Sequence, residues 1–290
     1  MGLMIIIGAL ELGGIFSIMS LGLYMSYKVL NIPDLTVDGS FVLGCAISAL
    51  CTINGYPYLG IICSFLFGLC AGYFTSVLIT RLNIMPLLAG ILTMTGLYSI
   101  NLRIMQERPN ISLFECDTIF NSLCEREYIS LFIIYILVFL LILVIYYFLK
   151  TQLGLALRAC GDNEDMVKAS SIDTDKMKML GLSLANGLVA MSGGIFAQYQ
   201  MFADIQSGTG MMVIALASII VGLSIIKKDT LLYQLLAVVF GSIFYRIILT
   251  FALQLGLPSG DLKLLSALLV IISIFISNKA KRGNKYVRVK

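Results

Sequence analysis

Long apolar runs recur from one end of this 290-residue sequence to the other. A helix needs about 20 apolar residues to cross the hydrocarbon core of a bilayer, whereas a membrane-spanning strand needs about half as many and alternates apolar with polar residues. The runs here are longer than a strand and lack that alternation. In addition, 59% of the residues are hydrophobic and only 12% are charged. The sequence therefore predicts an all-α, polytopic helical membrane protein.

The apolar runs define about nine transmembrane helices, within a range of about eight to ten. They cover residues 3–27, 37–53, 57–80, 85–105, 129–149, 179–201, 210–226, 231–253 and 262–278. The first run has no basic residue before it and no small-residue cleavage site after it, so we interpret it as a retained helix and not as a signal peptide. We expect residues 1–278 to form a single transmembrane domain.

Basic residues set the expected orientation, because Lys and Arg gather on the cytoplasmic side of membrane proteins. The tail 279–290 carries six basic residues and no acid, which places the C-terminus in the cytoplasm. Counting back places the segment 150–178 inside and the loop 106–128, with five acids against two arginines, outside. The N-terminus is then outside, unless the stretch 28–40 re-enters the membrane and changes the helix count by one.

The composition excludes several kinds of site. The sequence has no histidine, so the usual zinc sites, Ser-His-Asp triads and histidine proton relays are excluded. None of the seven cysteines forms a CxxC pair, and no P-loop pattern occurs. We expect no enzyme activity, no metal or cofactor bound by this chain and no nucleic-acid partner, so any ATP would be hydrolysed by a separate subunit.

A charged segment, Leu157 to Lys176, separates two long apolar runs. It contains five carboxylates and three basic side chains. Asp162 or Asn163 can cap a short helix over the residues that follow, and residues 171–175 have turn and cap chemistry. The segment therefore predicts one or two short helices on the cytoplasmic face with the small residues Ala159, Gly161, Ala169 and Ser170 exposed, although a plain solvated loop is the alternative.

Residues 154–178, "GLALRACGDNEDMVKASSIDTDKMK", followed by "LGLSLANGLVAMSGGIFAQ", resemble the signature of the permease subunits of branched-chain amino acid and ribose-type ABC importers. In that family this stretch forms the coupling helix that inserts into the ATPase subunit. Ser171 stands where the family usually has Gly. The resemblance implies ATPase-coupling residues at Gly154, Arg158, Ala159, Gly161, Asn163, Ala169, Ile172 and Asp173.

A second motif, "NIPDLTVDGSFVLG" (residues 31–44), interrupts an otherwise apolar pattern with Asp34 and Asp38. Carboxylates at membrane depth are costly, which makes them functional candidates by default. A plain cytoplasmic turn before a helix capped by Ser40 is the alternative. The same importer families carry a similar element beside the translocation path. Together with "LLAGILTMTGLYSINLRIM" (residues 87–105), the motif looks most like a sub-branch for which aromatic amino acids are one expected substrate.

Other polar side chains could line the same path. Arg246 could bind a substrate carboxylate, or it could pair with Glu11 or Asp261. The predicted translocation-path residues are Asp34, Thr36, Asp38, Ser40, Thr93, Asn101 and Arg246.

Two stretches of the sequence resemble one another. "DLTVDGSFVLGCAIS" from Asp34 and "DIQSGTGMMVIALAS" from Asp204 each run from an acid through a Gly-containing turn into a small-residue helix. In the expected topology they start on opposite sides of the membrane. Inverted repeats with interrupted helices are typical of transporters that work by alternating access.

The outer loop 106–128 is the expected docking surface for a solute-binding protein. It contains Cys116 and Cys124, which could form a disulfide in an oxidising compartment. The Cα separation that would decide the pairing is not given by the sequence.

Three functions are compatible with these observations. The resemblance favours the permease subunit of an ATP-driven importer that moves an amino acid or similar small solute by alternating access. It then implies a cytosolic ATPase that binds ATP and Mg²⁺, an extracytoplasmic solute-binding protein and a second permease copy, surrounded by lipid in the bacterial inner (plasma) membrane. The alternative is an ion-coupled secondary transporter that uses Glu11, Asp34 and Asp38. A membrane enzyme or sensor has little support, because no nucleophile stands beside a base.

Overall fold

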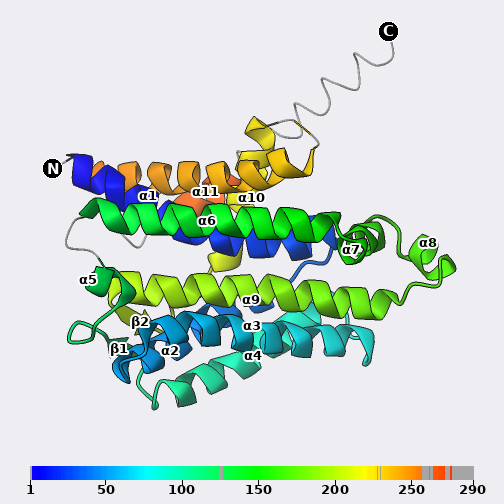
Figure 1. Ribbon diagram of the computed structural model, residues 1–290, viewed down its shortest axis with the longest axis horizontal. Helices are drawn as coiled ribbons and strands as arrows, with labels where there is room; N and C mark the ends of the chain where they lie inside the picture. Colours follow the sequence, from blue (N-terminus) through cyan, green and yellow to red (C-terminus); the bar gives the residue numbers. More distant parts are fainter. Residues whose placement is uncertain are drawn as a thin grey trace, which may run out of the picture.

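The computed structural model describes residues 2–123, 127–226, 228, 230–256, 261, 264–271 and 275. Its long helices lie side by side in one bundle (Figure 1). They are α1 (Gly2–Leu23), α2 (Thr36–Ile53), α3 (Pro57–Thr80), α4 (Pro86–Ile104), α6 (Glu127–Lys150), α9 (Thr174–Gln200) and α11 (Leu231–Gln254). The shorter elements are the π-helix η1 (Tyr24–Val29), α5 (Ile119–Leu123), α7 (Gln152–Asp162), α8 (Glu164–Ala169), α10 (Met211–Ile225) and the strands β1 (Asn110–Ser112) and β2 (Phe202–Asp204).

The predicted all-α membrane fold is confirmed. In the described part of the chain, 7 helices are long and apolar enough to cross a membrane, and α10 is a shorter apolar helix. The expected total of about nine spans stays a prediction. Of the last expected span, residues 262–278, only 264–271 and 275 are described, and the basic tail 279–290 lies outside the described residues.

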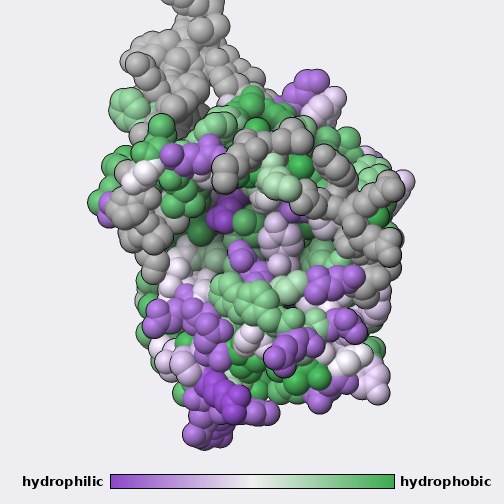
Figure 2. Space-filling view, turned by 90° about the vertical axis from the view of Figure 1, so that its left-hand side faces the viewer, coloured by the Kyte–Doolittle hydropathy of each residue, from purple (hydrophilic) through white to green (hydrophobic). Residues whose placement is uncertain are grey.

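The two ends of the bundle carry different elements. Helices α7 and α8 project from one end, whereas the start of α1, α5 and the two-stranded sheet lie at the other (Figure 1). The strands pair antiparallel, with Asn110 opposite Asp204, so part of the loop 106–128 is folded onto the bundle. Hydrophilic residues gather over the lower part of the end that carries the sheet (Figure 2). The possible Cys116–Cys124 disulfide cannot be followed, because Cys124 lies outside the described residues.

Helix α9 is the centre of the bundle, because small residues let its neighbours approach its backbone. A Cβ atom added at Gly44 on α2 would overlap the carbonyl oxygen of Ala190 and lie 2.6 Å from its carbonyl carbon. On α3, a Cβ at Gly68 would lie 2.6 Å from the carbonyl oxygen of Asn186. Close approach through small residues is the usual way in which helices pack within a bilayer.

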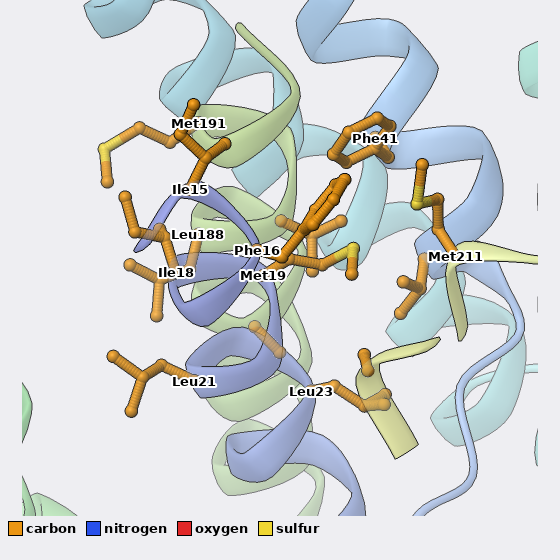
Figure 3. Packing of buried hydrophobic residues seen from close by; sticks show 14 of the residues in the cluster. Ile15, Phe16, Ile18, Met19, Leu21, Leu23, Phe41, Leu188, Met191 and Met211 are labelled. Atoms are coloured by element: carbon orange, nitrogen blue, oxygen red, sulfur yellow. The ribbon is translucent and has the colours of Figure 1, made fainter. Parts of the chain in front are cut away.

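Large apolar side chains fill the space where α1, α2 and α9 meet (Figure 3). The rings of Phe16, Phe41 and Phe196, one from each helix, have centroids 5.5–6.4 Å apart. Tilted aromatic contacts at this spacing add to the stabilisation from burial alone. This aromatic contact fixes the three helices against each other beside the polar groups described next.

Candidate functional site

A buried polar cluster lies where the start of α2 meets the middle of α9. The Asn186 Nδ2 atom donates to Asp34 Oδ2 at 2.6 Å, and the Ser40 hydroxyl donates to Asn186 Oδ1 at 2.7 Å. The Thr36 amide donates to Asp34 Oδ1 at 2.9 Å, and the Thr36 and Thr75 hydroxyl oxygens are 3.0 Å apart. All five residues are at most 1% exposed. The cluster is therefore enclosed within the protein, and a buried carboxylate in it is satisfied by hydrogen bonds.

Asn186 is the hub of this cluster. Its Nδ2 group donates to Asp34 and also to the Leu182 carbonyl oxygen at 3.1 Å, so both of its N–H donors are used. Turning the amide over would place its oxygen against two acceptors, which fixes its orientation. Asn186 is also the 13th residue of the 27-residue α9, counted from Thr174, so the cluster sits near the middle of a spanning helix.

Asp38 joins the start of α2 to the start of α10. Its Oδ1 atom accepts from the Met212 amide at 2.7 Å, and its Oδ2 atom accepts from the Gly210 amide at 3.0 Å. A carboxylate is stabilised at a helix N-terminus by the unpaired amides and by the helix dipole. Helix α10 thus begins against the first turn of α2.

The two similar stretches fold alike at their first turn. Asp34 Oδ1 accepts from the amide two residues later, Thr36, at 2.9 Å, and Asp204 Oδ1 accepts from the amide of Gln206 at 3.0 Å. Asp38, in the first turn of α2, contacts the start of α10, and the two helices run from there toward opposite ends of the bundle (Figure 1). The two stretches thus share their first turn, and the internal repeat stays a prediction.

The other predicted path residues do not join the cluster directly. Asn101 donates to the Gly39 carbonyl oxygen at 3.1 Å, while its own Oδ1 atom is buried without a hydrogen-bond partner. Thr93 lines a cavity between α3 and α4. Arg246 lies with its guanidinium carbon 5.3 Å from the centre of the Phe16 ring, and its Nε atom is buried without a partner.

The three carboxylates proposed for ion coupling lie in separate networks. Glu11 accepts hydrogen bonds from Ser130 and, at 2.8 Å, from the Tyr199 hydroxyl. Asp34 and Asp38 have the partners given above. Among the described residues, no ion pair joins Arg246 to Glu11 or Asp261, and no group of three His, Cys, Asp or Glu side chains could hold a metal ion.

The predicted short helices in the charged segment are α7 and α8, each with a side-chain cap. Thr151 Oγ1 accepts from the Gly154 amide at 3.3 Å, and Asn163 Oδ1 accepts from the Met166 amide at 3.1 Å. Asp173 caps α9 in the same way, through the Lys176 amide at 3.2 Å. Asn163, and not Asp162, is therefore the cap of α8.

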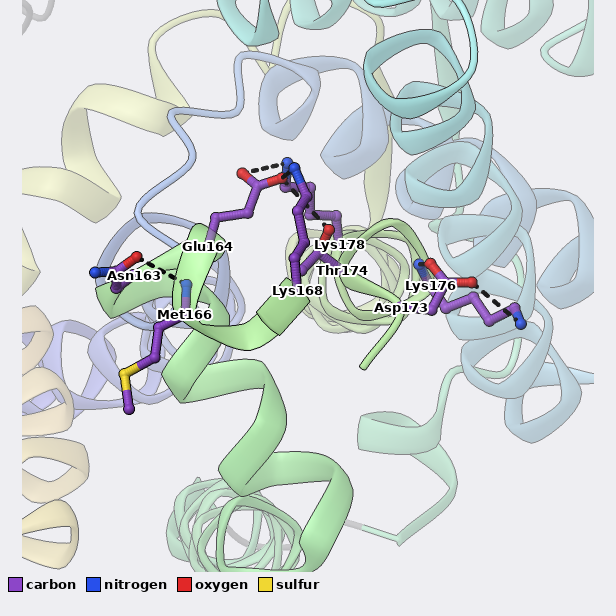
Figure 4. A network of polar contacts seen from close by, with 8 residues as sticks. All are labelled: Asn163, Glu164, Met166, Lys168, Asp173, Thr174, Lys176 and Lys178. Atoms are coloured by element: carbon purple, nitrogen blue, oxygen red, sulfur yellow. Dashed lines mark hydrogen bonds and ion pairs between the residues drawn. The ribbon is translucent and has the colours of Figure 1, made fainter. Parts of the chain in front are cut away.

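Glu164 ties α8 to the start of α9 (Figure 4). Its carboxylate pairs with Lys168 at 2.8 Å and with Lys178 at 2.7 Å. The hydrogen bond from Lys168, followed by that from Lys178, lowers the pKa of Glu164 from 4.5 to about 2. The contribution of these pairs is therefore complete above pH 4.5 and is lost as the pH falls toward 2.

The coupling residues divide into an exposed group and a buried group. Two glycines face inward: Gly154 is buried, and Gly161 approaches the end of η1 so closely that an added Cβ would overlap the Val29 carbonyl oxygen. The expectation that Gly161 belongs to the exposed small face was therefore wrong. Ser171 has a φ of 59°, in the left-handed region that favours glycine. The exposed residues are Arg158, Ala159, Asn163, Ala169, Ile172 and Asp173.

Replacing Glu164 by glutamine is expected to loosen α8 without unfolding the bundle. The neutral amide keeps the size of the side chain but loses both ion pairs, which are partly exposed and hence of modest strength. Amide hydrogen exchange of residues 163–173 should become a few-fold faster at neutral pH. Asp165→Asn is the matched control, because Asp165 is an exposed neighbour in the first turn of α8 and forms neither of these two ion pairs. Equal exchange in the two variants would contradict the role given to Glu164.

Sequence reasoning found the carboxylates but not their partners. Asn186 and Thr75 were not predicted, and neither were the backbone amides at Gly210 and Met212. The amide of Asn186 within an apolar, small-residue helix is a detectable signal, because an unpaired amide is costly in a membrane. Thr75 carries no such signal, since threonine is common in spanning helices.

Comparison with known proteins identifies the family. The family described as "Branched-chain amino acid transport system / permease component" matches residues 5–275. The tyrosine transport system permease protein of Clostridioides difficile (strain R20291) is 41% identical over 265 residues, which cover 91% of this chain and 88% of the relative. The uncharacterized protein RP368 of Rickettsia prowazekii (strain Madrid E) is 37% identical over 279 residues, 93% of this chain and 96% of that protein.

A more distant relative is the autoinducer 2 import system permease protein LsrC of Yersinia enterocolitica. It is 29% identical over 211 residues, which cover 72% of this chain and 57% of LsrC. No solved structure matches the chain. The helices that are long and apolar enough to span a membrane agree with a match to a permease family. The first two relatives align with 91% and 93% of the chain. The chain therefore belongs to the permease components of branched-chain amino acid transport systems, and it is an integral membrane transport protein and not an enzyme.

Proposed function

We propose that the chain is the membrane-spanning subunit of an ATP-driven importer, which moves a small solute inward by alternating access. The solute is an amino acid or similar metabolite delivered by an extracytoplasmic binding protein. ATP and Mg²⁺ are bound by a separate cytosolic ATPase, and a second permease copy completes a homodimer. The observation that carries this proposal is the packing of the charged segment 150–178 against the chain that leads to the buried polar cluster.

The first link in this packing is between α7 and η1. A Cβ at Gly161 would lie 2.9 Å from the carbonyl carbon of Val29 and 3.0 Å from the Cα of Leu30, so the two backbones are in contact. Leu30 and Leu157 are both buried there, at 4% and 0% exposure. Movement of α7 therefore pushes on the end of η1, since closely packed groups cannot be compressed.

The second link runs from Leu30 to the polar cluster. Only residues 31–33 separate Leu30 from Asp34, whose carboxylate is held by Asn186. A Cβ at Gly90 on α4 would lie 2.8 Å from the Leu35 amide nitrogen, so this connection is also confined from the other side. The connecting segment 30–35 thus transmits displacement of α7 to the starts of α2 and, through Asp38, of α10.

Tyrosine or another aromatic amino acid is the proposed solute. The support is the relative from Clostridioides difficile, whose printed name is that of a tyrosine transport system permease and which aligns with 91% of this chain. The carboxylates of Glu11, Asp34 and Asp38 lie in three separate hydrogen-bond networks, which favours the ATP-driven importer over ion coupling.

Co-purification tests the proposed ATPase coupling. The tagged permease, extracted in mild detergent, should bring down a cytosolic P-loop ATPase. Ala169→Arg should reduce the recovered ATPase by roughly tenfold or more, because a long charged side chain would stand on the exposed face of α8. Phe114→Arg, at an exposed position on the opposite end, is the control and should retain the ATPase. Absence of an ATPase from the wild-type preparation, or its full retention by Ala169→Arg, would contradict the proposal.

A further inference from the structure

A cavity of about 450 Å³ lies among α2, α3 and α4. Ligand pockets generally fall between roughly 300 and 1,000 Å³ and are mostly apolar with a few polar groups. Of the ten residues that line this cavity, Thr93 and Cys70 carry the only polar side-chain atoms. The rings of Phe67 and Phe74 form part of its wall. The cavity thus has the size and chemistry of a site for a small, largely apolar group.

The cavity lies at the depth of the buried polar cluster. Gly68, next to Phe67 on α3, is the residue whose Cβ would meet the Asn186 carbonyl oxygen. Leu43, another lining residue, precedes Gly44, which contacts Ala190 on α9. The cavity and the cluster therefore lie at one level in the bundle, on opposite faces of α2 and α3.

Two side-chain oxygen atoms in or near the cavity can each accept a further hydrogen bond. The Thr93 hydroxyl donates to the Ala89 carbonyl oxygen at 2.9 Å, which leaves its oxygen able to accept a bond. Thr93, the lining residue Leu97 and Asn101 follow at intervals of four on α4, so they share one helix face. The Oδ1 atom of Asn101 is buried and unpartnered, which is an unusual state for a side-chain amide.

We propose that this cavity holds the ring of an aromatic amino acid during transport. The inference rests on the proposed function and assigns its proposed substrate class, aromatic amino acids, to this cavity. Aromatic rings pack favourably against the rings of Phe67 and Phe74, and the Thr93 oxygen can accept from a phenol hydroxyl. Because the cavity opens on the face of α3 and α4 that the protomer leaves exposed, a solute moving along that face can reach it.

The native thiol of Cys70 provides the first test. Cys70 is exposed and lines the cavity, so a variant in which the other six cysteines are replaced by serine or alanine carries a single reporter. In the complete transporter in proteoliposomes, tyrosine should slow the labelling of Cys70 by a small methanethiosulfonate reagent, by roughly threefold or more at saturation. Leucine at the same concentration should protect less.

Filling the cavity provides the second test. A Cβ at Gly96 would meet no atom within 4 Å, so the side chain of a leucine substituted at this position fits and fills part of the cavity. Gly96→Leu should lower tyrosine uptake by roughly tenfold or more. It should leave purification yield and bound ATPase unchanged. Gly96→Ala, which adds a single methyl group, is the matched control and should retain most of the uptake.

The possible outcomes distinguish a failure of the cavity assignment from a failure of the proposed transport function. If the wild type imports tyrosine while neither protection nor the Gly96→Leu effect is seen, the cavity assignment is wrong and the proposed function stands. If the wild-type complex imports no amino acid, the proposed function itself fails. Protection of Cys70 by a fatty acid but not by tyrosine would identify the occupant as a lipid acyl chain and overturn the inference.

Discussion

Replacing Gly44 by valine is expected to eliminate folded protein from the membrane. The new Cβ would overlap the carbonyl oxygen of Ala190 and lie 2.8 Å from its Cα. These are backbone atoms of α9, so no flexible side chain can yield, and α2 and α9 must separate. Separation would also strain the hydrogen bonds between α2 and α9, such as that from Ser40 to Asn186. Overpacking of a core costs about 1–3 kcal/mol and occasionally more, and this substitution exceeds that range because the clash is with backbone atoms.

The measurement is the yield of monodisperse protein after detergent extraction, together with its thermal unfolding midpoint. Gly96→Ala is again the control, since its Cβ meets no atom within 4 Å. It should gain up to about 1 kcal/mol from the better helix propensity of alanine. A Gly44→Val protein with wild-type yield and midpoint would show that α2 and α9 are not in backbone contact.

Replacing Asn186 by leucine is expected to have the second-largest effect. Leucine is close to asparagine in size but offers no hydrogen bond, so Asp34 and Ser40 lose their shared partner. Asp34 keeps the hydrogen bond from the Thr36 amide, but its buried Oδ2 atom loses the hydrogen bond from Asn186, and we expect a loss of roughly 2–5 kcal/mol in the free energy of unfolding. Transport should be lost as well, because Asp34 no longer holds the connecting segment 30–35 against α9.

Two further variants separate stability from transport. The double variant Asp34→Leu, Asn186→Leu removes the buried carboxylate together with its partner, so much of the stability should return while transport does not. Asn101→Leu is the control for loss of a buried amide: it removes a single bond to the Gly39 carbonyl and should destabilise less. If Asn186→Leu and Asn101→Leu unfold at the same temperature, Asn186 is not the hub of the cluster.

Helix bounds follow from the sequence where apolar length and local signals agree. The expected spans 37–53 and 57–80 match α2 and α3 within one residue, and Pro57 stands at the first position of α3, where its missing N–H is not needed. For α9 the expected start at 179 was five residues late. The charged residues of its first turns interrupt the apolar pattern, whereas the side-chain cap at Asp173 marks the true start.

The site was only half predictable for a physical reason. Asp34 and Asp38 are conspicuous because charge in an apolar segment is costly, and this signal is local. Their partners lie 152 and 174 residues away in the chain, at Asn186 and Met212, and only helix packing brings them together. Gly161 was placed on the wrong face because a residue without a side chain has no hydropathy that reveals its direction.

The bond between Asp38 and the start of α10 has a consequence for biogenesis. During synthesis α2 emerges long before residues 210–212, so the Asp38 carboxylate enters the membrane before the amides that will hold it exist. These two hydrogen bonds therefore form only after more than half of the protein has been made. The contact between the starts of α2 and α10 is thus a late event in the assembly of the bundle.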